Sequence, residues 1–168
     1  KQLVLAALCV ALGVVLPVAF HSIPNAGSVL LPMHIPVLLC GLVCGPVYGL
    51  LSGILTPLLS SMITGMPPMA YLPSMLCELA AYGLVSGLVW RRVKHTLPMM
   101  YAALVTAMVA GRLVWGAVRF VLAGLTGGSF PFQAFLSGAL LTAVPGILAQ
   151  LVLIPLILTA LEKAGFMD

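Results

Sequence analysis

Three charged residues lie inside long apolar stretches of the sequence: Glu78, Arg112 and Arg119. A charged side chain in such a segment is costly and normally faces a partner or a water-filled cavity. A guanidinium prefers carboxylates and phosphates, because its planar fork makes two parallel hydrogen bonds with them. These residues can therefore form a buried ion pair, or a polar pocket for a small anion or a polar heterocycle.

Helical spacing predicts that aromatic rings accompany these charges. Residues at i, i+3, i+7 and i+11 share one helix face. Two such faces are expected, one with Arg112, Trp115 and Arg119 and the other with Tyr71, Glu78 and Tyr82. Complementary charges at similar depth favour contact between the two faces.

Two interpretations of these faces remain open. In the structural one, Glu78 and one arginine form a buried pair that fixes helix register, and the other arginine extends outward to water. In the functional one, two arginines against one carboxylate leave an unneutralised guanidinium in a pocket, and Trp115 supplies a stacking or lid surface.

Four further polar residues are candidates for the same site. Asn25 and His34 flank the start of the second apolar segment, and Gln133 opens the last one. Each is alternatively a helix cap or a solvated loop residue. Gln150 lies inside the last segment, where a hydrogen bond to a neighbouring helix is the structural alternative.

Composition places these residues in lipid. Of 168 residues, 62% are hydrophobic and 6% are charged, whereas a soluble domain carries about 25% charged residues. At about 20 residues per spanning helix, six spans nearly exhaust this length. We expect an all-α membrane protein, with residues 1–168 forming a single six-helix bundle and no soluble catalytic or nucleotide-binding domain.

Proline, glycine and polar residues divide the chain into the expected spans. These are residues 2–20, 33–44, 47–64, 71–90, 97–122 and 133–161. The second is short for about 30 Å of hydrocarbon, so we expect it to be tilted or to continue back through residues 28–31.

Basic residues predict the orientation. Arg91, Arg92 and Lys94 form a cluster after the fourth span, which is typical of a cytoplasmic loop. Both termini are then cytoplasmic, in agreement with Lys1 and Lys163. No basic face is available to follow nucleic-acid phosphates. Three longer loops face outside and suggest a pocket that opens outward: residues 21–31, 65–70 and 124–132.

No motif for enzyme chemistry is found in the sequence. No histidine lies deep in a span to activate a serine, and neither a His-Glu-x-x-His motif nor a phosphate-binding Gly-rich loop occurs. The spacing of Cys40 and Cys44 matches no common zinc or redox motif. We expect neither catalysis nor a metal or cofactor, so any ATP-driven activity would need another chain.

Glycines recur at four-residue spacing in three of the expected spans and in the turn at Gly45. Such faces let helix backbones approach closely in lipid, and we interpret the glycines as internal packing: Gly41, Gly45, Gly49, Gly53, Gly83 and Gly87. Ala7 and Ala11 repeat the spacing on the first span, where internal packing and a docking face for another protein are both open.

One block of sequence resembles a known family. It contains Leu31-Pro-Met-His-Ile-Pro-Val-Leu-Leu-Cys-Gly-Leu-Val-Cys-Gly-Pro46, Tyr48-Gly49, Leu55-Thr-Pro-Leu-Leu-Ser60 and Thr64-Gly-Met-Pro-Pro68. With Glu78 and Tyr82-Gly83, this block resembles the substrate-binding S components of energy-coupling factor (ECF) vitamin transporters. The match is close over the second to fourth spans and elsewhere extends to the six-helix layout.

This resemblance implies a function and partners. S components reside in the prokaryotic plasma membrane and bind one vitamin or precursor at the outer side, under the loops after spans one, three and five. They associate with a transmembrane coupling subunit and two cytoplasmic ATPases. Ala7 and Ala11 match the family's alanine face for the coupling subunit, which favours the docking interpretation.

The sequence leaves the identity of the substrate open. The Met-His-Ile-Pro and Gly-Met-Pro-Pro blocks are most similar to members assigned to pantothenate, and one excess positive charge suits its single carboxylate. Pyridoxine, hydroxymethylpyrimidine, a queuosine precursor, folate and riboflavin are alternatives. A stand-alone secondary carrier or structural membrane protein is the alternative of a different class, although a carrier typically shows inverted repeats.

Overall fold

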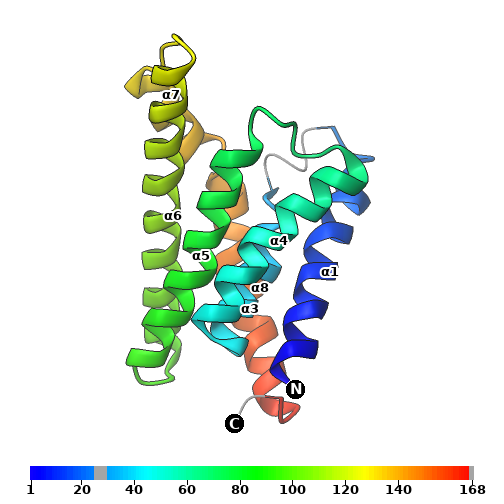
Figure 1. Cartoon of the computed structure of the whole chain (residues 1–168). Helices are drawn as coiled ribbons and strands as arrows, with labels where there is room; N and C mark the ends of the chain where they lie inside the picture. The colour runs from blue at the N-terminus through cyan, green and yellow to red at the C-terminus, as the bar shows by residue number, and fades with distance from the viewer. Residues whose placement is uncertain (25–29, 167–168) are drawn as a thin grey trace.

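The computed structural model describes residues 1–24 and 30–166, and this part of the chain is entirely helical and irregular, without strands (Figure 1). Asn25 lies outside the described residues. The elements are α1 (Gln2–Phe20), α3 (His34–Cys44), α4 (Pro46–Thr64), α5 (Leu72–Arg92), α6 (Leu97–Leu125), α7 (Phe132–Leu136), the π-helical turn η1 (Ser137–Leu141) and α8 (Val144–Lys163).

The predicted six-helix membrane bundle is confirmed. Within the described residues, five helical segments are long and apolar enough to cross a membrane, and α3 is a shorter apolar helix. The fifth span extends to Leu125, beyond the expected residue 122. α3 does not continue back through Leu31, because the φ angle of Leu31 is 48°, in the left-handed region.

The sixth span, predicted as one helix over residues 133–161, is present as the apolar helical segment Phe132–Lys163, but the helix is interrupted within it. The break separates α7 and η1 from α8 at Thr142 and Ala143. Pro145 in the first turn of α8 lacks a backbone N–H, and its ring disfavours a helix that continues from the preceding turn. The hydrophobic pattern alone conceals this break, because both parts are apolar.

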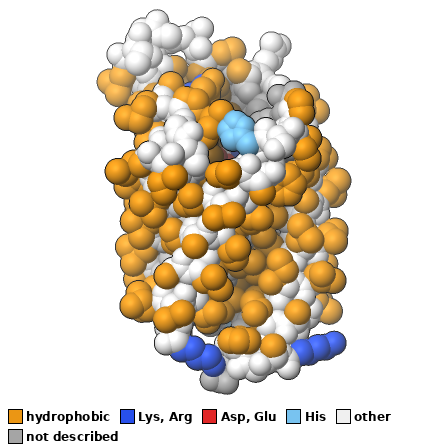
Figure 2. Space-filling model, turned by 90° about the vertical axis from the view of Figure 1, so that its right-hand side faces the viewer, with side chains coloured by type: hydrophobic (Ala, Val, Ile, Leu, Met, Phe, Trp, Pro, Cys, Tyr) orange, Lys and Arg blue, Asp and Glu red, His pale blue; other side chains and the backbone are white. Residues whose placement is uncertain are grey.

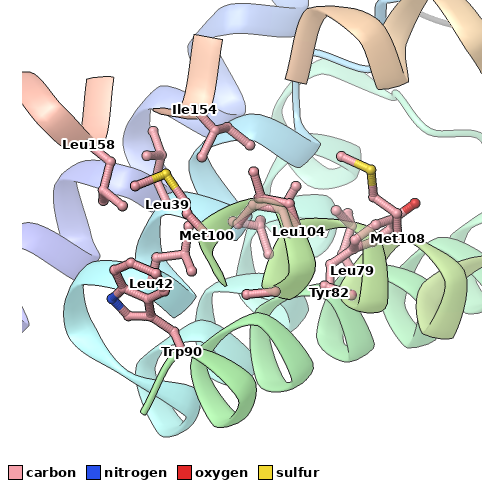
Figure 3. Packing of buried hydrophobic residues seen from close by; sticks show 14 of the residues in the cluster. Leu39, Leu42, Leu79, Tyr82, Trp90, Met100, Leu104, Met108, Ile154 and Leu158 are labelled. Carbon is pink, nitrogen blue, oxygen red and sulfur yellow. The ribbon is translucent and has the colours of Figure 1, made fainter. Parts of the chain in front are cut away.

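Helix α3 lies at the centre and contacts α1, α4, α5 and α8. Most of its side chains are buried, including Val37 and Leu38. Around it, Leu79 of α5, Leu104 of α6 and Ile154 of α8 form the apolar core (Figure 3). This core fixes the positions of the three helices that carry the candidate site: α3, α5 and α6.

Glycines allow α4 and α5 to pack backbone against backbone, as the four-residue spacing predicted. A Cβ atom on Gly83 would collide with the backbone of Gly49, and one on Gly49 would collide with the Gly83 carbonyl. Gly53 meets the backbone of Leu79 in the same way. This close crossing therefore fixes the position of Glu78 along the axis of the bundle, because Glu78 immediately precedes Leu79 on α5.

The two ends of the bundle differ. Both termini and the connection between α5 and α6 lie at one end, and the connections after α1, α4 and α6 lie at the other (Figure 1). Exposed Arg91, Arg92 and Lys94 mark the end with the termini, where Figure 2 shows Lys and Arg side chains. Under the positive-inside rule this end is cytoplasmic, as expected from the sequence.

Candidate functional site: a cavity at the outer end

A cavity of about 540 Å³ lies at the end away from the termini, where the space-filling view is hollowed, with a histidine beside the opening (Figure 2). Pockets for small molecules typically measure about 300–1,000 Å³. Prolines, methionines and other apolar residues form most of the wall. The polar and aromatic side chains on it include His21, His34, Tyr71, Glu78, Arg112 and Trp115.

Glu78 is the central polar residue of this cavity, and its side chain is 3% exposed. Its Oε1 atom lies 3.0 Å from Nη1 of Arg112 on α6 and 3.5 Å from Nε2 of His34 on α3. The predicted contact between the two charged faces is therefore present. The pair also lies on the wall of a cavity. The same contact can therefore fix helix register and face a bound substrate.

Tyr82 packs against His34 outside the cavity wall. It is 1% exposed, and its ring meets that of His34 edge-on with centroids 5.0 Å apart. A Cβ atom on Gly111 would lie 2.8 Å from the Tyr82 ring. The missing side chain at Gly111 thus lets Tyr82 pack against α6 directly beside Arg112. Tyr82 does not line the cavity itself.

Several polar atoms of the site lack a hydrogen-bond partner among the described residues. They are Nε and Nη2 of Arg112, both ring nitrogens of His34 and Oε1 of Glu78, all buried. A buried donor without an acceptor costs about 1–3 kcal/mol. A substrate that supplies acceptors near Arg112 would lower this cost.

Arg119 occupies a different position from Arg112. Its Cζ atom lies 4.8 Å from the centre of the Tyr71 ring and 5.6 Å from that of Phe130, within cation–π range. Tyr71 lines the cavity, whereas Arg119 does not. The second arginine therefore adjoins the cavity through an aromatic ring rather than contributing a charge to its wall.

Trp115 lines the cavity and is supported by two phenylalanines from the segment after α6. Its ring packs edge-on against Phe130 at 5.9 Å and near-parallel to Phe135 at 6.2 Å. The side chain of Trp115 also lies against Gly138, where a Cβ atom would approach the indole to 2.8 Å. This segment therefore fixes the position of Trp115 on the cavity wall.

Besides Tyr82 and Arg119, two more predicted site residues are not part of the cavity wall. Gln133 is exposed on α7, and Gln150 is fully buried on α8. Both amide atoms of Gln150 lack a hydrogen-bond partner within the described residues, so the hydrogen bond expected from it is not found there. Because the last span is interrupted before α8, Gln133 on α7 does not share one continuous helix with Gln150 on α8.

The sequence did not predict His21 or the proline loop (residues 66–68) as part of the cavity wall, although both belong to segments predicted to face outside. Ser60 Oγ donates to the Met66 carbonyl at 2.8 Å, and Ser61 Oγ donates to the Pro67 carbonyl at 3.0 Å. These bonds tie the loop after α4 to its own helix, so that Met66, Pro67 and Pro68 line the cavity. The two serines about one helical turn before Gly65-Met-Pro-Pro68 were the available signal.

Comparison with protein families identifies the chain. The family model described as "ECF transporter, substrate-specific component" matches residues 1–166. The chain belongs to this family. No curated protein and no solved structure matched it. As an ECF substrate-specific component it is a multi-pass membrane protein and a substrate-binding subunit of a transporter, and it works with ECF coupling and ATPase subunits on a small molecule.

Proposed function

We propose that this S component captures pantothenate in the outer cavity and delivers it with one coupling subunit and two ATPases. The observation that carries the proposal is Arg112, which lines the cavity and has a single charged partner, Glu78, at one of its three nitrogens. Nε and Nη2 have no hydrogen-bond partner among the described residues. A substrate carboxylate is the acceptor that a guanidinium best accommodates.

The rest of the cavity suits the remainder of such a molecule. Leu31, Met33 and Met75 offer apolar contacts for an alkyl chain. Tyr71, His21 and the Glu78 carboxylate provide polar groups for hydroxyls and an amide. An apolar wall with few convergent polar groups is the usual design of a small-molecule site.

One observation favours a second candidate, a neutral heterocycle. Glu78 already compensates the charge of Arg112, and the positive charge of Arg119 lies over aromatic rings, off the cavity wall. With Tyr71 and Trp115 available for stacking, pyridoxine, hydroxymethylpyrimidine or a queuosine precursor would be held by Glu78. The two candidates predict different ligands for the same cavity.

Tryptophan fluorescence tests the proposal, since Trp115 lines the cavity and Trp90 does not. Trp90 is buried and stacks on His95 with centroids 4.4 Å apart. We expect a saturable change in emission when the detergent-purified protein is titrated with pantothenate. The change should persist in Trp90→Phe and disappear in Trp115→Phe.

A panel of other vitamins and precursors gives the contrary outcomes. Saturation by a pyridine or pyrimidine but not by pantothenate would replace the first candidate with the second. No saturation by any compound, confirmed by equilibrium dialysis, would contradict a binding function for the cavity.

We also propose that α1 docks on the coupling subunit through Ala7 and Ala11. Buried Ala6 and Gly13 face the bundle, and Thr56 of α4 lies against Gly13. Ala7 and Ala11 are exposed on the rest of the helix surface. A surface of small residues lets a second membrane helix approach closely.

Bulky side chains on this surface should separate docking from substrate binding. We expect the double change Ala7→Leu and Ala11→Leu to abolish co-purification with the coupling subunit, and pantothenate binding to persist. Ala102→Leu, at an exposed alanine of α6, is the matched control and should leave co-purification unchanged. Normal co-purification of the double variant would show that the docking surface lies elsewhere.

A further inference from the structure

A single carboxylate oxygen in the cavity lies near two groups that can each be positively charged. Oε1 of Glu78 is 3.0 Å from Nη1 of Arg112 and 3.5 Å from Nε2 of His34. We propose that binding of a carboxylate substrate at this site is coupled to protonation of His34. This inference rests on the proposed function. It implies that the protein takes up one proton when the substrate binds.

The burial of His34 makes its charge depend on its neighbours. Its side chain is 2% exposed, and it comes from α3, whereas Glu78 and Arg112 come from α5 and α6. A buried charge is tolerated only when an opposite charge accompanies it. Glu78 provides one negative charge, which Arg112 already offsets, so without substrate the three-residue group is neutral when His34 is neutral.

A substrate carboxylate changes this balance. Its charge would bring the sum of Glu78, Arg112 and substrate to −1, beside the buried side chains of His34 and Glu78. One proton on His34 restores neutrality. The protonated ring would donate to Glu78 from Nε2, while Arg112 turns its remaining donors toward the substrate. Both nitrogens of His34 lack a hydrogen-bond partner among the described residues, so the proton displaces no existing bond there.

The other titratable or charged groups around His34 are less suited to this role. Tyr82 of α5 contacts the His34 ring, and Tyr71 lies on the same cavity wall. Tyrosine phenols are ordinarily neutral near pH 7 and do not gain a proton there. His21 also lines the cavity, but it is exposed to water, and Arg119 lies over the Tyr71 ring. Among these groups, His34 is the one beside Glu78 that can gain a positive charge.

The sign of the effect follows from linkage. If the bound state holds one proton more than the free state, lowering the pH favours binding. As the pH falls, affinity for pantothenate should then rise by up to about tenfold per pH unit, the limit for uptake of one proton. A ligand without a carboxylate should show no such dependence.

Calorimetry of the purified protein in buffers of different ionisation enthalpy measures the proton directly. We expect uptake of about one proton with pantothenate, as the linkage requires, and none with its alcohol analogue, pantothenol. His34→Gln, which retains a polar side chain but cannot carry the charge, should bind without proton uptake. His95→Gln is the matched control, since His95 stacks on Trp90 outside the cavity wall, and this variant should still take up the proton.

The possible results distinguish a failure of the proton coupling from a failure of the proposed function. Pantothenate binding without proton uptake, or uptake that survives in His34→Gln, would overturn the coupling and leave the proposed function in place. No pantothenate binding at any pH would overturn both. If His34→Gln does not bind, the wild-type comparison of pantothenate with pantothenol decides, and equal proton uptake by both ligands would contradict the coupling.

Discussion

Replacing Arg112 with alanine should weaken pantothenate binding by about 2–5 kcal/mol, or roughly 30-fold to several thousand-fold. The variant removes the guanidinium on the cavity wall and leaves Glu78 without the partner that lies 3.0 Å away. The substrate carboxylate would then enter a site with an unpaired negative charge. Equilibrium dialysis with labelled pantothenate measures the loss.

Two controls show that such a loss is specific to the carboxylate. Arg112→Lys retains the charge but not the planar fork, so we expect binding of intermediate strength. Pantothenol, which has no carboxylate, should bind wild type and Arg112→Ala similarly, which also reports that the variant is folded. Unchanged pantothenate affinity in Arg112→Ala would mean that the Glu78–Arg112 pair is structural.

Replacing Gly83 with alanine should destabilise the bundle, although alanine is the better helix former. Its Cβ atom would meet the backbone of Gly49, with the Cα atom 2.9 Å away. A backbone cannot rotate aside as a side chain can, so α4 and α5 must separate. Overpacking of this kind typically costs about 1–3 kcal/mol and occasionally more. Thermal unfolding in detergent measures the change.

Gly124 provides the matched control on α6, because a Cβ atom there has nothing within 4 Å. Gly124→Ala should leave stability unchanged or raise it by up to about 1 kcal/mol, the helix propensity difference. Separation of α4 from α5 should also displace Glu78, so Gly83→Ala is expected to bind substrate more weakly. Equal stability of the two variants would contradict close backbone packing at this crossing.

Much of this architecture could be predicted from the residues, because membrane burial restricts a chain of this composition to spanning helices. Prolines and glycines marked most helix ends, as at Gly45 and Gly65, where φ is positive. The break in the last span could not be recognised in this way, since its two parts are equally apolar. Pro145 was visible, but prolines also occur inside helices of this chain, for example Pro57.

The site was predictable where it depends on charge, and less so where it depends on loops. Glu78 and Arg112 were found because a charge in an apolar helix needs a partner. His34 was a weaker candidate by type, and its contact with Glu78 depends on the packing of α3 against α5. The proline loop enters the wall through hydrogen bonds from Ser60 and Ser61, which helical periodicity does not describe.

The spacing of Arg119 correctly placed it on the same face as Arg112 but did not show its partner. The side chain lies between the rings of Tyr71 and Phe130, and Phe130 comes from the segment after α6 rather than from a helix. An excess charge counted from the sequence therefore does not equal an excess charge on the cavity wall. The ligand comparison must decide between a carboxylate and a neutral heterocycle.

Whether the cavity binds a carboxylate is best measured by equilibrium dialysis of the wild-type protein against pantothenate and pantothenol, in parallel with pyridoxine and hydroxymethylpyrimidine. We expect saturable binding of pantothenate and binding of pantothenol at least tenfold weaker, since the lost bidentate contact to Arg112 is worth about 1.5–3 kcal/mol. Equal affinity for the acid and the alcohol, or binding of a heterocycle in place of pantothenate, would contradict this expectation.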